Sequence, residues 1–330
     1  MSGDHGLRVT VPASLQILQA HTGLHLTLVG DTSKIDNALQ QHELADDLRA
    51  RLSIAQADTV LAMDAAPTEI LRGSQASSLH VVLGMLGEGA VDGIVSAGNT
   101  AALVALGRRQ VSMLQGFSRP AYCSAIPVRD GFCYMLDLGA NVDCDAQSLH
   151  EFAVMGSALV TALEGVSEPR VGLLSNGSEA NKGDALIKLA AQRLAGDSRL
   201  NFCGFVEGDH LHEARVQVIV SDGLLGNVAL KTAEGTAQLA SYMVRQGFER
   251  NWWRRMLGIL ALPVLRELRQ SLSGERHGGA FLLGLQGVVV KSHGGAEQSG
   301  FAAALQQAVT CVEHQMVPRL AHYLDNQPNP

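Results

Sequence analysis

Three apolar segments of this chain each end in a short polar turn and then lead into a helical pattern. They are residues 94–100 (Ile-Val-Ser-Ala-Gly-Asn-Thr), 135–141 (Met-Leu-Asp-Leu-Gly-Ala-Asn) and 218–227 (Val-Ile-Val-Ser-Asp-Gly-Leu-Leu-Gly-Asn). Apolar runs that alternate with helices are typical of a parallel sheet covered by helices on both faces. A parallel sheet brings such turns together at the carboxyl ends of its strands, where helix N–H groups and short side chains hold anions. The pattern therefore predicts an α/β fold with a site for phosphate or a phosphorylated ligand.

The same alternation continues along most of the chain. Strands are expected near Leu24–Val29, Val91–Ser96, Ala121–Pro127, Cys133–Leu138, Val171–Ser175, Phe202–Val206, Val216–Ser221 and Val288–Val290. Helices are expected near Pro67–Glu88, Thr100–Met113, Ala146–Glu164, Ala180–Leu194 and Val228–Gln246, and as one long helix over Ala296–Leu324. Because no linker or repeat divides the chain, residues 1–330 are expected to form a single α/β domain with one helical excursion.

Composition narrows the class of protein and its partners. The 330 residues are 46% hydrophobic and 17% charged, enough apolar material for a large core. A net charge of -7 argues against nucleic acid as the main partner. The five cysteines form no CxxC pair, so a disulfide framework and a thiolate zinc site are not indicated. With no signal peptide and no apolar run of membrane-spanning length, we expect a cytoplasmic protein, at most attached to the inner face of a membrane.

The helical excursion at residues 248–272 has an unusual composition. It contains both tryptophans, Trp252 and Trp253, beside a leucine-rich face that Pro263 is expected to break. Between residues 245 and 276 there are seven arginines and three glutamates, a local net charge of +4. Such an amphipathic basic segment suits a hairpin that lies on a membrane surface. A helix pair that packs in the core or between two subunits has the same pattern, so both interpretations stay open.

The first two polar turns carry candidate binding residues. Ser96, Gly98, Asn99 and Thr100 suit contacts to an oxyanion, although helix capping explains the same residue types. In residues 137–145, three aspartates could suggest a divalent metal. Asp143 and Asp145 also lie where a helix dipole favours acids, and Asp137, at a strand end, can hold the loop by accepting backbone N–H groups. Asp137, Gly139 and Asn141 are therefore predicted to support the loop and position substrate, with no metal. No histidine lies near Cys144 in sequence, so it is interpreted as a bystander rather than a nucleophile.

Three later turns supply the candidate catalytic residues. Lys182, beside Gly183, lies where a cation can meet phosphate or a developing oxyanion, although a solvated surface lysine is an equal alternative. In the turn with Asp222, Gly223 and Gly226, Asn227 either caps a helix or polarises a carbonyl group. His293 lies in a fifth glycine-rich turn and could donate to phosphate. No GxGxxG follows a strand, which makes a dinucleotide-dependent dehydrogenase a remote alternative.

Taken together, these segments resemble the bacterial phosphate acyltransferases of the PlsX family over nearly the whole chain. The resemblance rests on residues 95–100, the nine-residue segment 137–145, Phe152–Gly156, Lys182-Gly183, residues 222–231 and residues 291–294. It implies a three-layer α/β/α Rossmann-like fold with a mostly parallel sheet, similar to isocitrate dehydrogenases and phosphotransacetylases. It also implies a homodimer.

The implied reaction is transfer of a fatty acyl group from acyl carrier protein to inorganic phosphate, which gives acyl phosphate for phospholipid synthesis. Lys182 and Asn227 match positions associated with catalysis in the family, and no cofactor or metal is implied. The 248–272 segment matches the region by which the family attaches to membranes, and a downstream acyltransferase would use the product.

Two other functions stay open at the level of sequence. An acyl-CoA thioester could replace the carrier-protein thioester as donor, as in phosphotransacetylases. The turn before Lys182 reads Gly177-Ser178-Glu179 where the family has Gly-Glu-Glu, which removes an acid near the expected site. This change suggests a catalytically impaired scaffold at a membrane surface as a further alternative.

Overall fold

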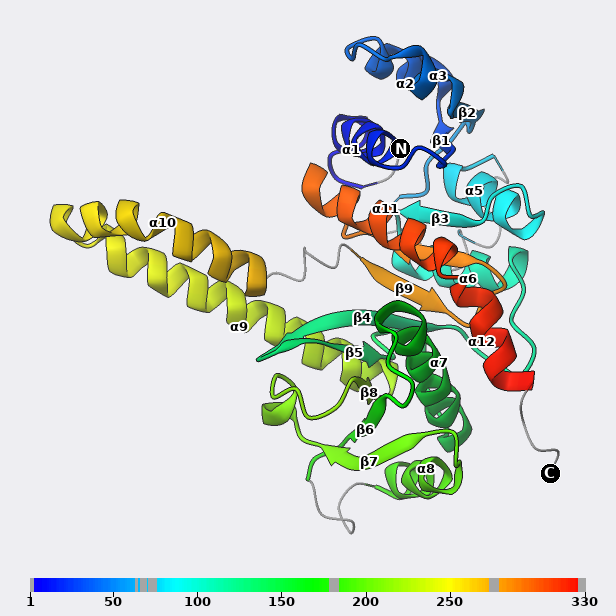
Figure 1. The fold of residues 1–330 in the computed structure, drawn as a ribbon, viewed down its shortest axis with the longest axis vertical. Coiled ribbons are helices and arrows are strands. Elements are labelled where there is room, and N and C mark those ends of the chain that lie inside the picture. Colours follow the sequence, from blue (N-terminus) through cyan, green and yellow to red (C-terminus); the bar gives the residue numbers. More distant parts are fainter. Residues whose placement is uncertain are drawn as a thin grey trace.

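The fold is built on an eight-stranded sheet (Figure 1). The structure is a computed structural model that describes residues 3–62, 65, 70, 76–177, 184–272 and 279–325, with backbone only for 266–272 and 323–325. The strand order is β3 (Gly93–Ser96), β10 (Val288–Lys291), β9 (Ala280–Leu283), β4 (Ala121–Val128), β5 (Gly131–Leu136), β8 (Val218–Val220), β6 (Arg170–Leu174) and β7 (Asn201–Val206). A separate parallel pair is formed by β1 (Leu26–Gly30) and β2 (Leu52–Gln56).

The direction of the strands changes in the middle of this sheet. β3 and β10 are parallel, and so are β5, β8, β6 and β7. Between these two groups, β9 and β4 pair antiparallel with each other, with β10 and with β5. The reversal follows from the tight connection of β4 to β5, where only Arg129 and Asp130 separate the strands and Gly131 has a φ of 101°. The expectation that the polar turns all follow strands of one direction is therefore wrong, because β3 and β10 run opposite to β5 and β8.

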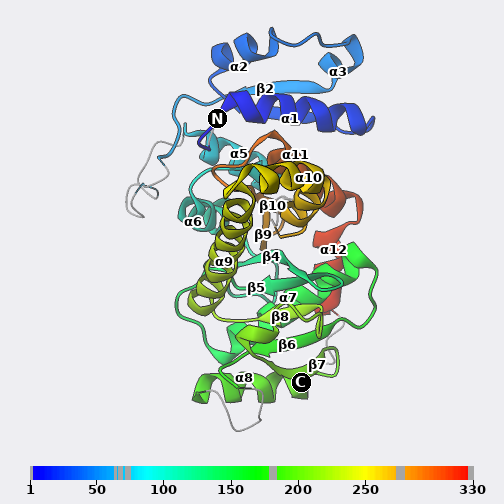
Figure 2. The same cartoon turned by 90° about the vertical axis from the view of Figure 1, so that its left-hand side faces the viewer.

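Helices cover both faces of the sheet and give three layers (Figure 2). One face packs against α7 (Ala146–Glu164), α8 (Ala185–Gly196), α11 (Gln298–Glu313) and α12 (Met316–Asp325). The other packs against α5 (Ser78–Gly87), α6 (Thr100–Gln110) and the start of α9 (Gly223–Glu249). Beside α11 lies α1 (Leu7–Ala20), and α2 (Thr32–Leu39), α3 (Asp46–Ala50) and a short 3₁₀ helix, η1 (Gly208–His210), complete the described elements. The predicted α/β/α class is confirmed.

A pair of long helices projects from the body as an arm (Figure 1). It consists of the second half of α9 and α10 (Trp252–Leu272), which pack against each other. The bend lies at Arg250 and Asn251, where the Asn251 side chain accepts a 3.0 Å hydrogen bond from the Arg254 amide. The predicted break at Pro263 is wrong: α10 runs through this proline, which removes only one backbone hydrogen bond from the helix.

The carboxyl-terminal region also differs from the expected single helix. Two helices, α11 and α12, replace it, and the break lies at Gln315, whose φ is 54°. A left-handed residue ends α11, and Pro318 fits only the first turn of the helix that follows. Parts of two other predicted helices, 67–88 and 180–194, lie outside the described residues. In the described part of the chain, no helix is long and apolar enough to cross a membrane.

Candidate active site

Asp137 organises the loop that follows β5. Its carboxylate is fully buried and accepts hydrogen bonds from the amide of Tyr122 (2.8 Å), the amide of Ala140 (3.1 Å), and the backbone and side-chain amides of Asn141 (2.7 and 2.9 Å). Burial raises the pKa of Asp137, and these hydrogen bonds work in the opposite direction. The geometry makes Asp137 a support for the loop, since protein donors already surround its carboxylate.

The first turn of α9 lies directly against this loop. Asp222 caps the helix by accepting a 2.8 Å hydrogen bond from the Leu225 amide. A Cβ atom at Gly223 would lie 2.2 Å from the Asn141 carbonyl oxygen, and one at Gly226 would lie 2.0 Å from that of Asp137. Only glycine allows the helix backbone to approach so closely. The two glycines thus fix the position of α9 relative to the Asp137 loop.

Asn227, in the first turn of α9, lies at the surface beside this packing. It is exposed, and its side chain forms no hydrogen bond with any residue that the structure describes. Its neighbour is Gly139, where a Cβ atom would lie 3.5 Å from the Cβ of Asn227. Gly139 has a φ of 115°, a conformation that favours glycine. The free amide of Asn227 can therefore donate to a carbonyl oxygen or oxyanion above the loop.

The turn between β3 and α6 forms a second group of predicted residues. Ser96 accepts a 3.1 Å hydrogen bond from the Gly98 amide, and Asn99 caps α6 by accepting a 2.9 Å hydrogen bond from the Ala102 amide. Asn99 also donates to the carbonyl of Ala62. Capping is thus a demonstrated role of Asn99, and Thr100 is exposed at the start of the helix.

Tyr122 connects the two groups, and it was not predicted from the sequence. Its backbone amide binds the Asp137 carboxylate, while its hydroxyl lies 3.3 Å from the carbonyl oxygen of Thr100. The ring is buried, with 2% of its surface exposed. Burial, with Asp137 nearby, raises the pKa of this phenol far above its usual value, so it stays protonated as a donor. An isolated tyrosine in a strand gives no sequence signal for such a role.

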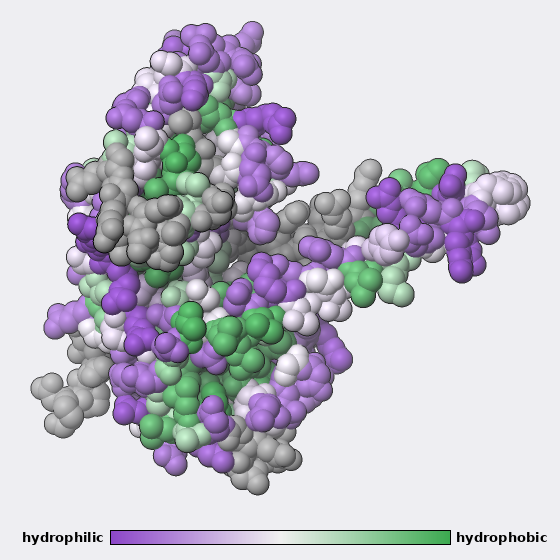
Figure 3. Space-filling model, turned by 180° about the vertical axis from the view of Figure 1, so that it is seen from behind, coloured by the Kyte–Doolittle hydropathy of each residue, from purple (hydrophilic) through white to green (hydrophobic). Residues whose placement is uncertain are grey.

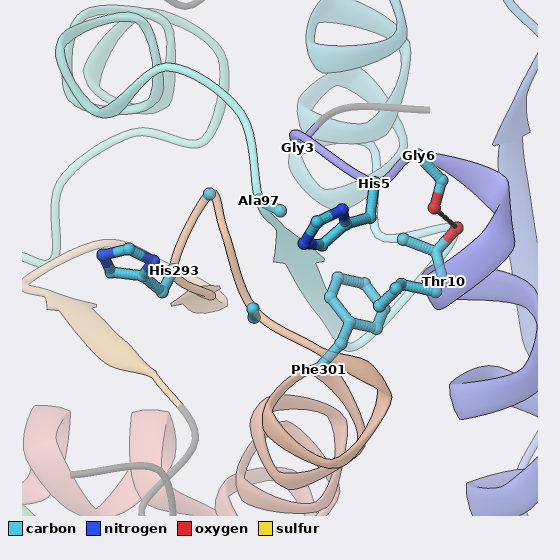
Figure 4. Close-up of a pocket in the computed structure, with 10 residues that line it drawn as sticks. Gly3, His5, Gly6, Thr10, Ala97, His293 and Phe301 are labelled. Atoms are coloured by element: carbon cyan, nitrogen blue, oxygen red, sulfur yellow. Dashed lines mark hydrogen bonds between the residues drawn. The ribbon is translucent and has the colours of Figure 1, made fainter. Parts of the chain in front are cut away.

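His293 lies in the turn after β10. Its Nδ1 accepts a 3.1 Å hydrogen bond from the Gly295 amide, which leaves Nε2 as the donor of the neutral ring. A pocket of about 10 Å³ lies beside this turn, lined by Gly3, His5, Ala97 and Phe301 among others. Figure 4 shows the His5 ring beside Ala97 and Phe301, with the backbone of the turn between it and His293. The pocket has room for about one water molecule, too little for an acyl chain.

A larger hollow of about 400 Å³ lies between α7 and α8. His150, Arg193, Asp197 and Arg199 line it, and Asp197 binds both His150 (2.8 Å) and Arg199. These ion pairs lower the pKa of Asp197. The hollow lies on the sheet face opposite to Asn227, so it is not part of the site predicted from the sequence.

Lys182 and Cys144 are two further features predicted from the sequence. Lys182 lies outside the described residues, so its position relative to Asn227 stays a prediction. Burial raises the pKa of the Cys144 thiol to about 11, which suits the bystander interpretation. Among the residues with described placement, no group of three or more His, Cys, Asp or Glu side chains could hold a metal ion.

Comparison with known proteins places this geometry in a family. The model of a family described as fatty acid synthesis protein matches residues 1–319. A phosphate acyltransferase from Pseudomonas syringae pv. syringae (strain B728a) is 48% identical over 325 residues, 98% of this chain and 95% of the relative. One from Nitrosococcus oceani is 46% identical over 309 residues, 94% of this chain and 90% of the relative. This chain belongs to the phosphate acyltransferase family. Membership confirms the resemblance drawn from the sequence.

Solved structures support the fold of this family member. A phosphotransacetylase from Streptococcus pyogenes superposes with a TM-score of 0.62 at 17% identity, covering 94% of this chain and 91% of the other. EutD phosphotransacetylase from Staphylococcus aureus gives a TM-score of 0.56 at 16% identity, covering 92% and 90%. At these identities the likeness concerns the α/β architecture.

Proposed function

We propose that this chain transfers a fatty acyl group from acyl carrier protein to inorganic phosphate, forming acyl phosphate for phospholipid synthesis. The observation that carries the proposal is the exposed amide of Asn227, which has no hydrogen bond to any described residue and lies beside the Asp137 loop in a chain 48% identical to a phosphate acyltransferase. An amide fixed in this way suits a developing oxyanion, because it needs no reorganisation during the reaction.

The chemistry requires little from the protein beyond positioning. A phosphate oxygen attacks the thioester carbonyl carbon, so that a C–O bond forms and the carbonyl oxygen becomes an oxyanion. The intermediate collapses, the C–S bond breaks, and the thiolate leaves and takes up a proton. Asn227 donates to the oxyanion, and we assign to Lys182 the neutralisation of phosphate or of the same oxyanion. No covalent acyl-enzyme is needed, because phosphate is itself the nucleophile.

The proposal that acyl carrier protein, rather than CoA, carries the acyl group is tested by comparing the two donors. Purified protein is given phosphate and the same acyl chain as either carrier-protein or CoA thioester, and acyl phosphate is trapped as the hydroxamate. The proposal predicts a higher kcat/KM with the carrier protein. A clear preference for CoA would replace it by phosphotransacetylase-like activity.

We further propose that the arm formed by α9 and α10 attaches the enzyme to the inner surface of the cell membrane. Large apolar side chains near its tip are exposed, among them Trp252 (63%), Trp253 (62%) and Leu260 (78%). The two indole rings stack with centroids 4.1 Å apart. Arginines on the same helices favour an anionic surface, and Figure 3 shows a few apolar groups among hydrophilic ones on the arm and a larger apolar patch on the body below it.

This attachment would deliver acyl phosphate to a downstream acyltransferase at the membrane. A homodimer is also part of the proposal, since the apolar side chains of Leu239, Tyr242 and Met243 on α9 are more than half exposed in the single chain.

A further inference from the structure

Lys291 is a buried lysine that has no role in the reaction proposed above. It is the last residue of β10, only 9% exposed, and it pairs in parallel register with Ser96 of β3. Val289, two residues earlier in the strand, packs on the face that carries α5, α6 and the start of α9. Because side chains two residues apart in a strand share a face, Lys291 and Ser96 point to that same side.

The charge of Lys291 is poorly balanced by the protein. Its Nζ donates to the carbonyl oxygen of Ser292, and it forms no ion pair within 4.0 Å in the described part of the chain. Burial lowers the pKa of Lys291 to about 8; the charge of Asp4 opposes this effect, and the smaller effect of Lys231 adds to it. An ammonium group has three donors, and a single carbonyl oxygen leaves two of them available.

Lys231 is a second cation, whose charge contributes to the lowered pKa of Lys291. It lies on α9 one turn after Asn227, so both side chains occupy the same face of the helix. Its ion pair with Glu234, at 2.8 Å, is solvent-exposed and therefore weak. The first turn of α6, which follows Ser96, adds backbone N–H groups without partners inside the helix. Two lysines from different elements and a helix N-terminus together favour a dianion.

We propose that Lys291, together with Lys231, binds the phosphate that attacks the acyl donor. The inference rests on the proposed function for the identity of the reaction and adds the site of the nucleophile. Phosphate between the two ammonium groups would remove their repulsion and compensate the buried charge of Lys291. Because Lys231 and Asn227 are one helical turn apart, the nucleophile would lie beside the amide that receives the carbonyl oxygen.

Thermal unfolding with inorganic phosphate alone tests the site without any acyl donor. Lys291→Met keeps the length of the side chain and removes the charge, and Lys188→Met, on the exposed face of α8, is the matched control. We expect phosphate to raise the Tm of the wild type and of Lys188→Met, but not that of Lys291→Met. Lys231→Met is expected to weaken the response and provides a second test if Lys291→Met does not fold. An undiminished response to phosphate in the folded variants would overturn the inference.

Steady-state kinetics separates the nucleophile from a phosphate group carried by the donor. Lys291→Met should raise the KM for phosphate roughly tenfold or more and leave the KM for the acyl donor unchanged. A change confined to the KM for the donor would assign the lysines to the donor's own phosphate and overturn the proposal.

The two proposals fail separately. If the wild type makes no acyl phosphate but loses its phosphate response with Lys291→Met, the anion site stands and the proposed reaction fails. If turnover is normal and the KM for phosphate is insensitive to Lys291, the reaction stands and the site fails.

Discussion

Asn141 donates two hydrogen bonds to the same carboxylate oxygen of Asp137, from its backbone amide at 2.7 Å and from its side chain at 2.9 Å. The Asn141 side chain also donates 2.8 Å to the carbonyl oxygen of Pro120, so one residue joins the loop to the strand before it. This small network places Gly139 under Asn227. The shape of the site therefore depends on an acid that need not touch the substrate.

Asp137→Asn should lower the free energy of unfolding by about 2–4 kcal/mol. The new amide group must place N–H donors where the carboxylate accepted hydrogen bonds, and no water can reach the buried position. Urea unfolding measures the change, with Asp143→Asn as the control, because Asp143 is exposed in the same segment. Equal stability of the two variants would show that the network contributes little.

Gly226→Ala should separate α9 from the Asp137 loop. The added methyl group would lie 2.0 Å from a backbone oxygen and 2.4 Å from Ser221 Oγ, so the helix must shift. We expect a loss of about 1–3 kcal/mol of stability and little remaining turnover. Gly235→Ala in the same helix meets nothing within 4 Å and is expected to stabilise the protein by about 0.5–1 kcal/mol. A tolerated Gly226→Ala, in urea unfolding and in turnover, would argue against this close packing.

The buried charge of Lys291 should make stability depend on pH above neutrality. Its pKa falls from 10.5 to about 8 in the folded protein, so the folded state loses this proton before the unfolded state does. Below pH 8 Lys291 is protonated in both states, so the folded state bears the full free-energy cost of burying the charge. Between pH 8 and 10.5 the folded state loses the proton and this cost disappears. The unfolding free energy of the wild type should therefore rise relative to Lys291→Met across this window. Asp4, Lys231 and His293, the neighbouring charged or titratable groups, are the same in both proteins. If the difference in unfolding free energy between the wild type and Lys291→Met stays constant or falls across this window, Lys291 does not carry a buried charge.

Replacing Trp252 and Trp253 by alanine should weaken binding to vesicles that contain anionic lipid, by about tenfold or more. Sedimentation with vesicles measures the bound fraction, and Leu189→Ala serves as the control because Leu189 is exposed on α8, away from the arm. Unchanged binding of the double variant would favour a purely dimer-forming role for the hairpin.

Sequence reasoning was most successful where local signals decide the structure. The bounds of α7 were predicted correctly because Asp145 caps its start and Gly165, with a φ of 70°, ends it. Helix α1 was not predicted, since it has no side-chain cap and contains Pro12. Strand β9 has only four residues, too few to show a period. The opposed directions of β3 and β5 depend on a hairpin, which the turn motifs themselves do not encode.

In the site, too, residues with a local sequence signal were predicted, and residues that depend on tertiary packing were not. Asn227 was predicted as a site residue, and its side-chain amide has no hydrogen bond within the described part of the chain. Lys291 was passed over, because a lysine at the end of a strand looks solvated until tertiary packing buries it. Tyr122 was missed for a similar reason: its two hydrogen bonds join loops that are distant in sequence.

The most direct test of phosphate acyl transfer is the formation of acyl phosphate by wild type and Asn227→Ala, measured as hydroxamate with an acyl carrier protein thioester and phosphate. Asn227 is exposed, so its replacement should leave the fold intact while lowering kcat by about 100- to 1000-fold. Asn37→Ala, an exposed asparagine within α2, should keep full activity. We predict phosphate-dependent product from the wild type and this selective loss in Asn227→Ala. A folded wild type that makes no acyl phosphate, or an Asn227→Ala variant as active as the wild type, would contradict it.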